Sequence, residues 1–406
     1  MKDVQTLEAS LAFRLDQRFR TLFSYFYTLL LTPFLLTDFT LDIILCLNPW
    51  TRPSSSWTLN QAARMRVVRL VLLYWSLTKS FDRLHLRPGR ERNRFQVIRA
   101  QPPKLYRGAL SDPAIKPDRT MGVTWTPARP PPPSLASKSE DMVVCLHFHG
   151  GGFAIGNGRD EDTGYLAPTL VKHMGVTHVC TPQYRLSSAG RQNRFPAPVQ
   201  DALTAYLALT REMGIPAKQI ILSGDSAGAN IAIGLLRYIS EHGRELSIPA
   251  PAAVALWSPW VDVHAAIDQD MRTSPNYRTD YLSKEFGRWG AQAVSGYMAV
   301  DLKGPYLSPL HHPFGALKGD DGATLPMFVH GGEREVLCPD IERFAEVYGE
   351  KGWNVKLVVS RHCPHDIILL GPRIGFHEEA EQACRDARDW FAATATGLRL
   401  RGVGDS

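Results

Sequence analysis

The fold is decided by residues 220–230, which read Ile-Ile-Leu-Ser-Gly-Asp-Ser-Ala-Gly-Ala-Asn. Apolar residues lead into the pentapeptide Gly-Asp-Ser-Ala-Gly, and a run that suits a helix follows from Ala227 to Ser240. This order predicts a strand, a sharp turn with Ser226 at its apex, and a helix. Gly224 and Gly228 suit a turn so tight that side chains there would collide with the strand and the helix.

The predicted turn also has the chemistry of a nucleophile. It lifts the Ser226 hydroxyl clear of the sheet. It leaves the backbone N–H of Ala227 in the first turn of a helix, where N–H groups lack partners and favour negative charge. We expect Asp225 to hold the turn rather than to transfer protons. Because the pentapeptide alone also fits a glycine-rich turn with a capping serine, the rest of the chain has to distinguish the two readings.

Short apolar segments alternate with helical segments from residue 142 onward. The predicted strands are 142–148, 176–181, 219–223, 252–257, 325–330 and 354–359. The predicted helices are 161–174, 198–213, 227–242, 340–351 and 377–394. This alternation predicts an α/β fold, with a mostly parallel sheet covered by helices on both faces and ligands beyond the carboxyl ends of the strands. Residues 260–310 interrupt the alternation and predict an inserted cap.

Three successive glycines follow the first of these strands, in the order His149-Gly150-Gly151-Gly152. Glycines at a strand end let backbone N–H groups approach a ligand with no side chain between them. We predict that Gly151, Gly152 and Ala227 donate to the oxygen that becomes negative during acyl transfer. The other reading is a phosphate-binding loop, but the tract lacks both G-x-G-x-x-G and a terminal Gly-Lys-Ser/Thr.

The two glycine motifs together carry a family resemblance. The chain has His149-Gly150-Gly151-Gly152-Phe153 and then Gly224-Asp225-Ser226-Ala227-Gly228, with His149 and Ser226 77 residues apart. This arrangement resembles the hormone-sensitive-lipase-like branch of the α/β-hydrolase superfamily over residues 142–394. Shorter matches are Tyr184-Arg185-Leu186, Phe195-Pro196-Ala197 with Asp201, Ser258-Pro259-Trp260 and Leu307-Ser308-Pro309-Leu310. The resemblance implies an α/β-hydrolase fold and a serine hydrolase of carboxylic esters that needs no cofactor or metal.

The resemblance also implies the partners of the serine, because in this superfamily an acid and then a histidine follow the nucleophile along the chain. Glu335 stands where the family usually has Asp, so we predict that it is the acid, with Glu333 and Asp340 as alternatives. His365, 30 residues further on, is the predicted base, and His362 is the alternative. The predicted function is ester hydrolysis by two-step acyl transfer through Ser226, His365 and Glu335.

Two other functions fit the same sequence. A biosynthetic hydrolase-fold enzyme would release or cyclise a small metabolite with the same three residues. A non-catalytic small-molecule receptor would share the fold, but relatives of that kind have lost the histidine, and His365 is present here.

The composition narrows the class of protein. An apolar fraction of 44% and a charged fraction of 21% are typical of a globular protein. The six cysteines are scattered without a C-x-x-C pair, so they predict reduced core residues rather than disulfides or a zinc site. Because the chain also lacks Asn-x-Ser/Thr acceptors, we expect an intracellular protein.

The positive charge is concentrated near the N-terminus. Residues 1–100 hold 15 Lys and Arg against 7 Asp and Glu, whereas residues 101–406 hold 31 against 33. No motif with interleaved aromatic residues accompanies this charge, so we expect no nucleic-acid partner. Attraction to a membrane surface explains the charge better.

Residues 1–100 predict a hydrophobic and basic helical arm, with an amphipathic helix in 1–20 and another in 59–86. Between them, residues 21–37 carry no charge, and the apolar character continues to residue 50. Two readings of residues 19–50 stay open. The segment either anchors the chain at a membrane, spanning it or lying in the interface, or packs as a cap over the active site.

The arm and the α/β region are separated by residues 101–141, which are rich in proline and predict an extended linker or a surface hairpin. We therefore expect a hydrolase domain over 142–396, with the cap at about 260–310.

Overall fold

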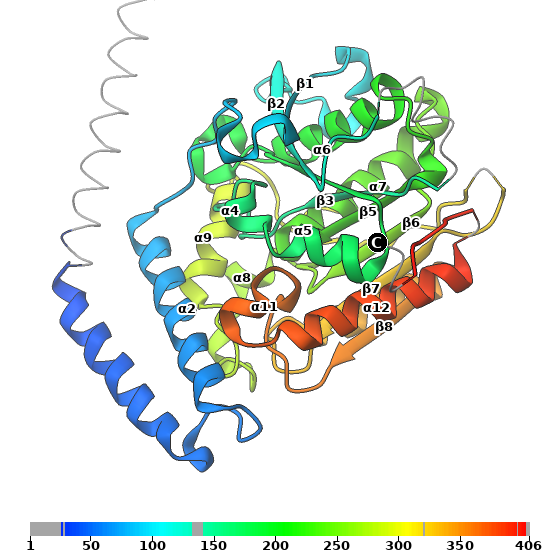
Figure 1. The fold of residues 1–406 in the computed structure, drawn as a ribbon. Helices are drawn as coiled ribbons and strands as arrows, with labels where there is room; N and C mark the ends of the chain where they lie inside the picture. Colours follow the sequence, from blue (N-terminus) through cyan, green and yellow to red (C-terminus); the bar gives the residue numbers. More distant parts are fainter. Residues whose placement is uncertain (1–25, 27–28, 132–140, 320, 396, 403–406) are drawn as a thin grey trace, which may run out of the picture.

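The structure, a computed structural model, describes residues 26, 29–131, 141–319, 321–395 and 397–402. Its centre is an eight-stranded sheet with the strand order β1-β2-β4-β3-β5-β6-β7-β8 (Figure 1). β2 pairs antiparallel with β1 and β4, and every other neighbouring pair is parallel. The prediction of a mostly parallel sheet is confirmed.

The strands are β1 (Phe95–Arg99), β2 (Thr120–Thr126), β3 (Val144–Phe148), β4 (His178–Pro182), β5 (Ile220–Asp225), β6 (Ala253–Trp257), β7 (Pro326–Gly332) and β8 (Asn354–Ser360). The labelled α-helices are α2 (Leu59–Thr78), α4 (Asp160–Thr163), α5 (Leu166–Thr169), α6 (Ala197–Leu207), α7 (Ser226–Leu246), α8 (Ala265–Asp268), α9 (Lys284–Val294), α10 (Cys338–Glu350), α11 (Ile367–Ile374) and α12 (His377–Thr394). An apolar helix, Leu29–Leu47, precedes them.

The central strands of the sheet are buried on both faces, because most of their side chains are apolar on both sides of the strand. In β3, Leu146 and Phe148 belong to one hydrophobic cluster, which includes side chains of α6, α7 and α10. The alternate residue Cys145 belongs to a second cluster with α5 and α12. Since side chains of a strand alternate between faces, one strand supplies both cores. All six cysteines are buried and unpaired, as expected.

The prediction of a linker over residues 101–141 is wrong for β2, which lies inside the sheet between β1 and β4. β1 in turn comes from the segment predicted as an arm. The prolines misled the prediction because they flank the strand and do not interrupt it: residues 120–126 contain none. The part of the proline-rich segment at 132–140 lies outside the described residues.

Two predicted helices are shorter than expected. α2 begins at a capping box of Thr58 and Gln61 and ends at Thr78, where Lys79 adopts a left-handed conformation with φ of 53°. The predicted helix 161–174 divides into α4, α5 and a terminal π-helical turn, with Gly164 closing α4.

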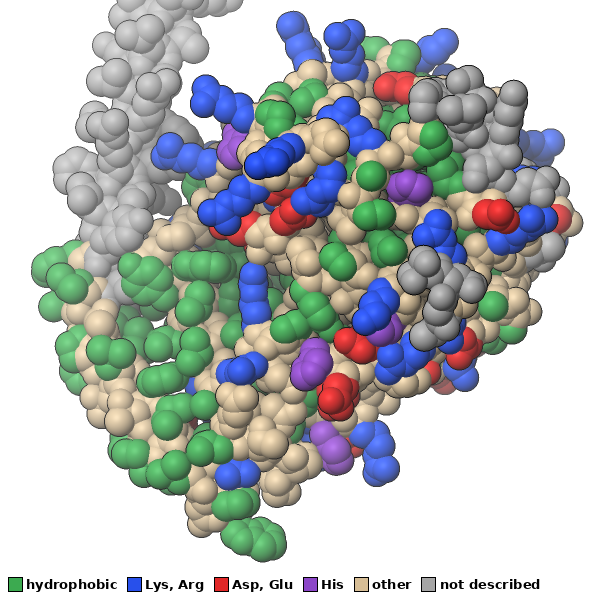
Figure 2. Space-filling model, in the orientation of Figure 1, with side chains coloured by type: hydrophobic (Ala, Val, Ile, Leu, Met, Phe, Trp, Pro, Cys, Tyr) green, Lys and Arg blue, Asp and Glu red, His purple; other side chains and the backbone are tan. Residues whose placement is uncertain are grey.

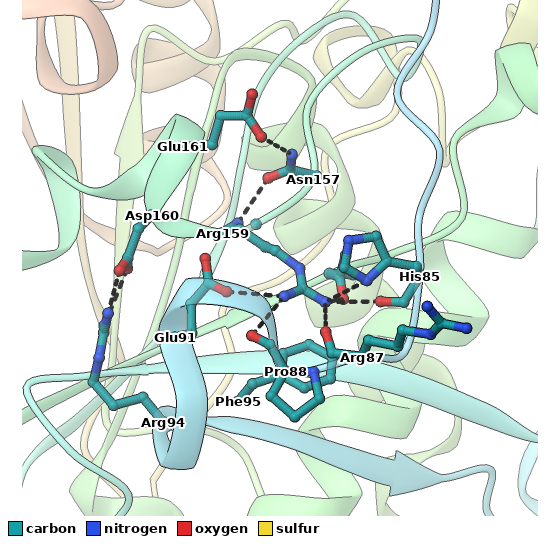
Figure 3. Close-up of polar contacts among 12 residues, drawn as sticks. His85, Arg87, Pro88, Glu91, Arg94, Phe95, Asn157, Arg159, Asp160 and Glu161 are labelled. Carbon is teal, nitrogen blue, oxygen red and sulfur yellow. Dashed lines mark hydrogen bonds and ion pairs between the residues drawn. The ribbon is translucent and has the colours of Figure 1, made fainter.

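Arg159 ties the segment that follows α2 to the sheet (Figure 3). Its buried guanidinium forms an ion pair of 2.9 Å with Glu91 and lies 4.0 Å from the ring centroid of Phe95. It also donates to three backbone carbonyl oxygens, those of His85, Arg87 and Pro88. This one side chain therefore fixes the path of the chain between α2 and β1.

The C-terminal half of the apolar helix Leu29–Leu47 packs against the middle of α2. Asp42 forms a 3.2 Å ion pair with Arg66 of α2, and Cys46 is buried in the same cluster as Met65. By length and composition this helix could cross a membrane, yet only 6% of its most apolar window is buried. The amphipathic helix predicted for 1–20, and residues 19–25, 27 and 28 of the predicted 19–50 segment, lie outside the described residues.

We predict that Arg159→Ala lowers the free energy of unfolding by about 3 kcal/mol, because it leaves Glu91 buried without its partner. The measurement is urea unfolding followed by circular dichroism. Arg343→Ala, which removes an exposed ion pair with Glu346, is the matched control and should leave the midpoint unchanged. Equal midpoints for both variants would contradict the anchoring role of Arg159.

Candidate active site

Four strand ends bring the predicted site residues together. Ser226 follows β5 directly, and the glycine tract follows β3. Glu335 lies in the loop after β7, and His365 lies in the loop after β8. Because the carboxyl ends of parallel strands meet at one edge of the sheet, four loops far apart in sequence converge there.

The turn at Ser226 is strained and needs glycine on both sides. Ser226 has φ of 48°, in the left-handed region that a side chain rarely adopts. A Cβ on Gly224 would lie 2.4 Å from the backbone of Gly228, and a Cβ on Gly228 would lie 1.9 Å from the carbonyl oxygen of Phe148. The pentapeptide is therefore a strand-to-helix turn, and the serine stands at its apex.

Ser226, His365 and Glu335 form a continuous hydrogen-bonded chain. The Ser226 Oγ lies 3.0 Å from His365 Nε2, and His365 Nδ1 lies 2.5 Å from Glu335 Oε2. The other oxygen of Glu335 accepts from the N–H of Gly332 at 2.5 Å and from the hydroxyl of Ser258 at 3.1 Å. With Glu335 ionised, Nδ1 of the imidazole carries the proton and Nε2 is left to accept from the serine.

The alternative acids and the alternative histidine lie elsewhere. Glu333 and His362 are both partly exposed and face each other, with Glu333 accepting a 2.8 Å hydrogen bond from the His362 N–H. Asp340 lies in α10 and interacts electrostatically with Asp262 and His311. Among the described residues, the structure brings only Glu335 and His365 into line with Ser226.

Burial and neighbouring negative charges shift the pKa of His365 in opposite directions. Burial alone lowers the pKa of the imidazole, but the hydrogen bond and negative charge of Glu335, with the charges of Asp280 and Asp366, raise it to about 9. Burial raises the pKa of the Glu335 carboxyl, and its hydrogen bond to His365 opposes that rise. Glu335 Oε2 lies only 2.5 Å from His365 Nδ1, so the carboxylate strongly favours the protonated ring. The pKa of His365 is therefore raised.

The glycine tract forms an open loop beside the serine. Gly151 and Gly152 have φ of 103° and 61°, and within the described chain neither N–H donates to another protein group. A Cβ on Gly152 would lie 3.3 Å from the ring of Phe286, and a Cβ on Gly290 would lie 2.4 Å from the carbonyl oxygen of Gly152. Helix α9 of the predicted cap therefore packs directly against this loop.

Asp225 joins the loop to the turn. One oxygen accepts from the N–H of Gly150 at 2.7 Å, and the other lies 2.8 Å from Nε2 of the buried His147. Both contacts are structural, as expected for a residue that holds the turn. His149 is also structural: its ring stacks on Tyr184 at 4.3 Å, and burial lowers its pKa to about 4, which keeps it neutral.

Several residues that hold the acid loop were not predicted. Asn276 donates to the carbonyl oxygens of Glu333 and Glu335, each at 3.0 Å. Asp280 accepts from the N–H of Val336 at 2.7 Å, and Thr279 donates to the carbonyl of Arg334 at 2.9 Å. Ser258 had a signal in the matched Ser258-Pro259-Trp260. The polar residues at 276–280 carried no such sequence signal, because a loop sequence does not show which distant loop it will contact.

A pocket of about 370 Å³ opens above Ser226 and His365. The loop after β3 lines it with His149, Gly150 and Gly151, and the segment 260–310 with Tyr281, Leu282 and Phe286. Its remaining apolar wall comes from α2 and α11, through Val68, Leu72, Leu369 and Leu370. Most of the lining is apolar, so the pocket suits a molecule with a hydrocarbon portion placed next to the serine.

Comparisons with known proteins agree with the fold. A family described as alpha/beta hydrolase fold matches residues 145–369, more than half of the chain. The acetyl-hydrolase of Streptomyces hygroscopicus is 31% identical over 202 residues, which cover 50% of this chain and 60% of that protein. The ethyl acetate hydrolase of Pseudomonas putida is 29% identical over 259 residues, covering 63% of this chain and 73% of that enzyme.

Solved structures show the same fold. A hormone-sensitive lipase from a metagenome library is 25% identical, with a TM-score of 0.54, over 68% of this chain and 82% of the lipase. An esterase from the bacterial hormone-sensitive lipase family has a TM-score of 0.56 at 21% identity, over 82% of this chain and 99% of the esterase.

We predict that the His365 ring titrates well above the ordinary histidine pKa of about 6.5. Glu335→Gln should lower its pKa strongly, because the variant loses both the hydrogen bond and the charge of Glu335, the largest contributions that oppose burial, and keeps only the smaller ones of Asp280 and Asp366. The measurement is the ring chemical shift in protein labelled with ¹³C-histidine, and His365→Gln identifies the signal. A wild-type pKa at or below 6.5 would mean that burial outweighs the carboxylate.

Proposed function

The chain belongs to the α/β hydrolase fold family, in its hormone-sensitive-lipase-like esterase branch, and we propose that it cleaves carboxylic esters by two-step acyl transfer from Ser226. Ester cleavage is the activity in the names of its relatives. The observation that carries the proposed mechanism is the chain of hydrogen bonds from Ser226 through His365 to Glu335.

In the first step, His365 acts as the base and Ser226 as the nucleophile. Because the raised pKa of His365 leaves most rings protonated near neutral pH, attack starts from the fraction of enzyme in which the ring is neutral, and this fraction grows as the pH rises towards about 9. In that form Nε2 takes the hydroxyl proton while Oγ attacks the ester carbonyl carbon. Glu335 stabilises the positive charge that develops on the ring. The N–H groups of Gly151, Gly152 and Ala227 are the proposed donors to the oxyanion, and the positive φ of both glycines supports this role.

The tetrahedral intermediate then collapses to an acyl-enzyme. His365 gives its proton to the leaving alcohol, and the acyl group stays on Oγ. Water that gives a proton to the same imidazole attacks the acyl carbon, and Oγ leaves with that proton as the acid is released. All proton transfers pass through one ring, so no cofactor or metal is required.

No observation favours the biosynthetic alternative, which would use the same three residues on another substrate. The receptor alternative is disfavoured because an idle serine would have no need of a buried, hydrogen-bonded His–Glu pair.

We also propose an intracellular protein that associates with a membrane surface through residues 19–50 and has no nucleic-acid partner. Six buried, unpaired cysteines support an intracellular location, because disulfides are rare in reducing compartments. The exposed apolar helix Leu29–Leu47 supports the membrane contact.

Ser226→Ala should reduce hydrolysis of p-nitrophenyl butyrate by at least about 10⁴-fold, because no other group can form the acyl-enzyme. The release of p-nitrophenol measures the rate. The exposed serine variant Ser111→Ala controls for the loss of a hydroxyl and should retain the wild-type rate. Comparable rates in wild type and Ser226→Ala would refute the mechanism.

Glu335→Gln should lower kcat roughly 10³-fold or more, because the imidazolium loses its counter-charge and Nδ1 loses its acceptor. Glu333→Gln is the matched variant two residues away, and it should change kcat little because Glu333 contacts His362 instead. The two rates are compared on the same ester. If Glu333→Gln were the more damaging change, the acid would have been assigned to the wrong glutamate.

A further inference from the structure

The helix Leu29–Leu47 presents apolar side chains to solvent along its length. Seven of its large apolar residues are more than half exposed, namely Leu29, Leu30, Phe34, Leu36, Leu41, Ile44 and Leu47. Trp50, just beyond the helix, is 89% exposed. A monomeric soluble protein rarely leaves so large a contiguous apolar area in water.

The exposed area continues onto α2 and reaches the pocket. Val67, Val71 and Trp75 line the pocket and are still 48%, 39% and 38% exposed. Their spacing of four residues places them on one face of the helix. These three side chains therefore form a rim, one side of which faces the interior of the pocket and the other faces solvent.

The two helices present one apolar surface. They are joined by the ion pair between Asp42 and Arg66 and by the burial of Cys46 in the cluster that holds Met65. Figure 2 shows hydrophobic side chains gathered over both elements, with Lys and Arg side chains and some Asp and Glu side chains above and to the right of the area. We call this area, formed by the helix Leu29–Leu47 and the rim residues of α2, the docking surface.

We propose that the docking surface binds a lipid bilayer and turns the mouth of the pocket towards the lipid. The helix Leu29–Leu47 is apolar over 19 residues, and only 6% of its most apolar window is buried, so its outer face is free to enter the lipid. Its only charged residues are Asp38 and Asp42, and Asp42 is paired with Arg66. The excess of Lys and Arg in residues 1–100 complements anionic headgroups.

This inference rests on the ester hydrolysis proposed above and adds a substrate class, namely esters with long acyl chains that are dissolved in the membrane. An acyl chain that passes the apolar rim moves from lipid into a pocket lined by Leu72, Leu369 and Leu370. It does not have to cross water, so transfer carries little hydrophobic cost. A short ester in water reaches Ser226 without the docking surface.

The first test compares two substrates with vesicles of phosphatidylcholine and phosphatidylserine. The double variant Phe34→Asp with Leu41→Asp places charges on the docking surface, outside the pocket lining. It should co-sediment with vesicles at least about tenfold less than wild type, because carboxylates are costly to insert among lipid chains. Hydrolysis of p-nitrophenyl palmitate dissolved in the vesicles should fall by a similar factor, whereas hydrolysis of p-nitrophenyl acetate in water should not change.

The matched control is Val97→Asp, which makes the same kind of change on β1, away from the docking surface. Val97 is 42% exposed, so the added carboxylate is solvated, and both binding and palmitate hydrolysis should remain. Equal loss in the control and the double variant would overturn the proposal. It would also be overturned if the wild type failed to bind vesicles and formed a dimer, by light scattering, that the double variant abolished.

The second test measures the orientation of the pocket. All six native cysteines are buried, so Val71→Cys and Val97→Cys can each be labelled with an environment-sensitive dye. Vesicles should shift the emission of the dye at position 71 to shorter wavelength and leave the dye at position 97 unchanged. Vesicle binding without a shift at position 71 would show that the mouth faces away from the lipid.

The outcomes separate this inference from the function on which it rests. If wild type hydrolyses p-nitrophenyl acetate and Ser226→Ala does not, the esterase mechanism stands whatever the vesicles show. If neither ester is cleaved but vesicles still bind, the function fails and the docking surface remains. Co-sedimentation of Ser226→Ala at the wild-type level is expected, because docking needs no turnover.

Discussion

Backbone packs directly on backbone where β5 passes into α7, and the site depends on this contact. Gly228 lies so close to the carbonyl of Phe148 that a single Cβ would stand 1.9 Å from its oxygen. Asp225 then bridges from the same turn to the N–H of Gly150. The serine and the glycine loop therefore keep one fixed separation, which the proposed oxyanion site requires because its donors come from both the loop and the turn.

The remaining support comes from segments outside the alternating strands and helices. Asn276, Thr279 and Asp280 hold the loop of Glu335 through its backbone. On the other side, the indole N–H of Trp57 donates to the carbonyl of His362 at 2.7 Å, within the loop of His365. The loop of the acid is thus held by the insertion at 260–310, and the loop of the base by a residue that precedes α2. Both the arm and the insertion therefore help to position the site.

The sequence was most informative where function demands an unusual backbone. Gly224, Gly228 and the glycine tract could be predicted because few other structures need glycine at that spacing. The sequence could not separate Glu335 from Glu333, since two residues in one loop differ only in which way they point, and that depends on the bonds from Gly332 and Ser258. β2 was missed because flanking prolines resemble those of a linker. A cap formed by the arm was one of the open alternatives, but which of its residues line the pocket could not be predicted, because that contact joins residues far apart in the chain.

The role of α2 in the pocket wall has a consequence for how such an enzyme diversifies. The groups that transfer protons stand at strand ends in the core of the fold, where nearly any substitution disturbs packing. Val67, Val71 and Trp75 belong to a helix whose outer face is in solvent, where substitutions cost little stability. Under the proposed function, part of the substrate-binding wall therefore stands where substitutions cost less stability than they do at the reacting groups, so the pocket can change while the reaction stays the same.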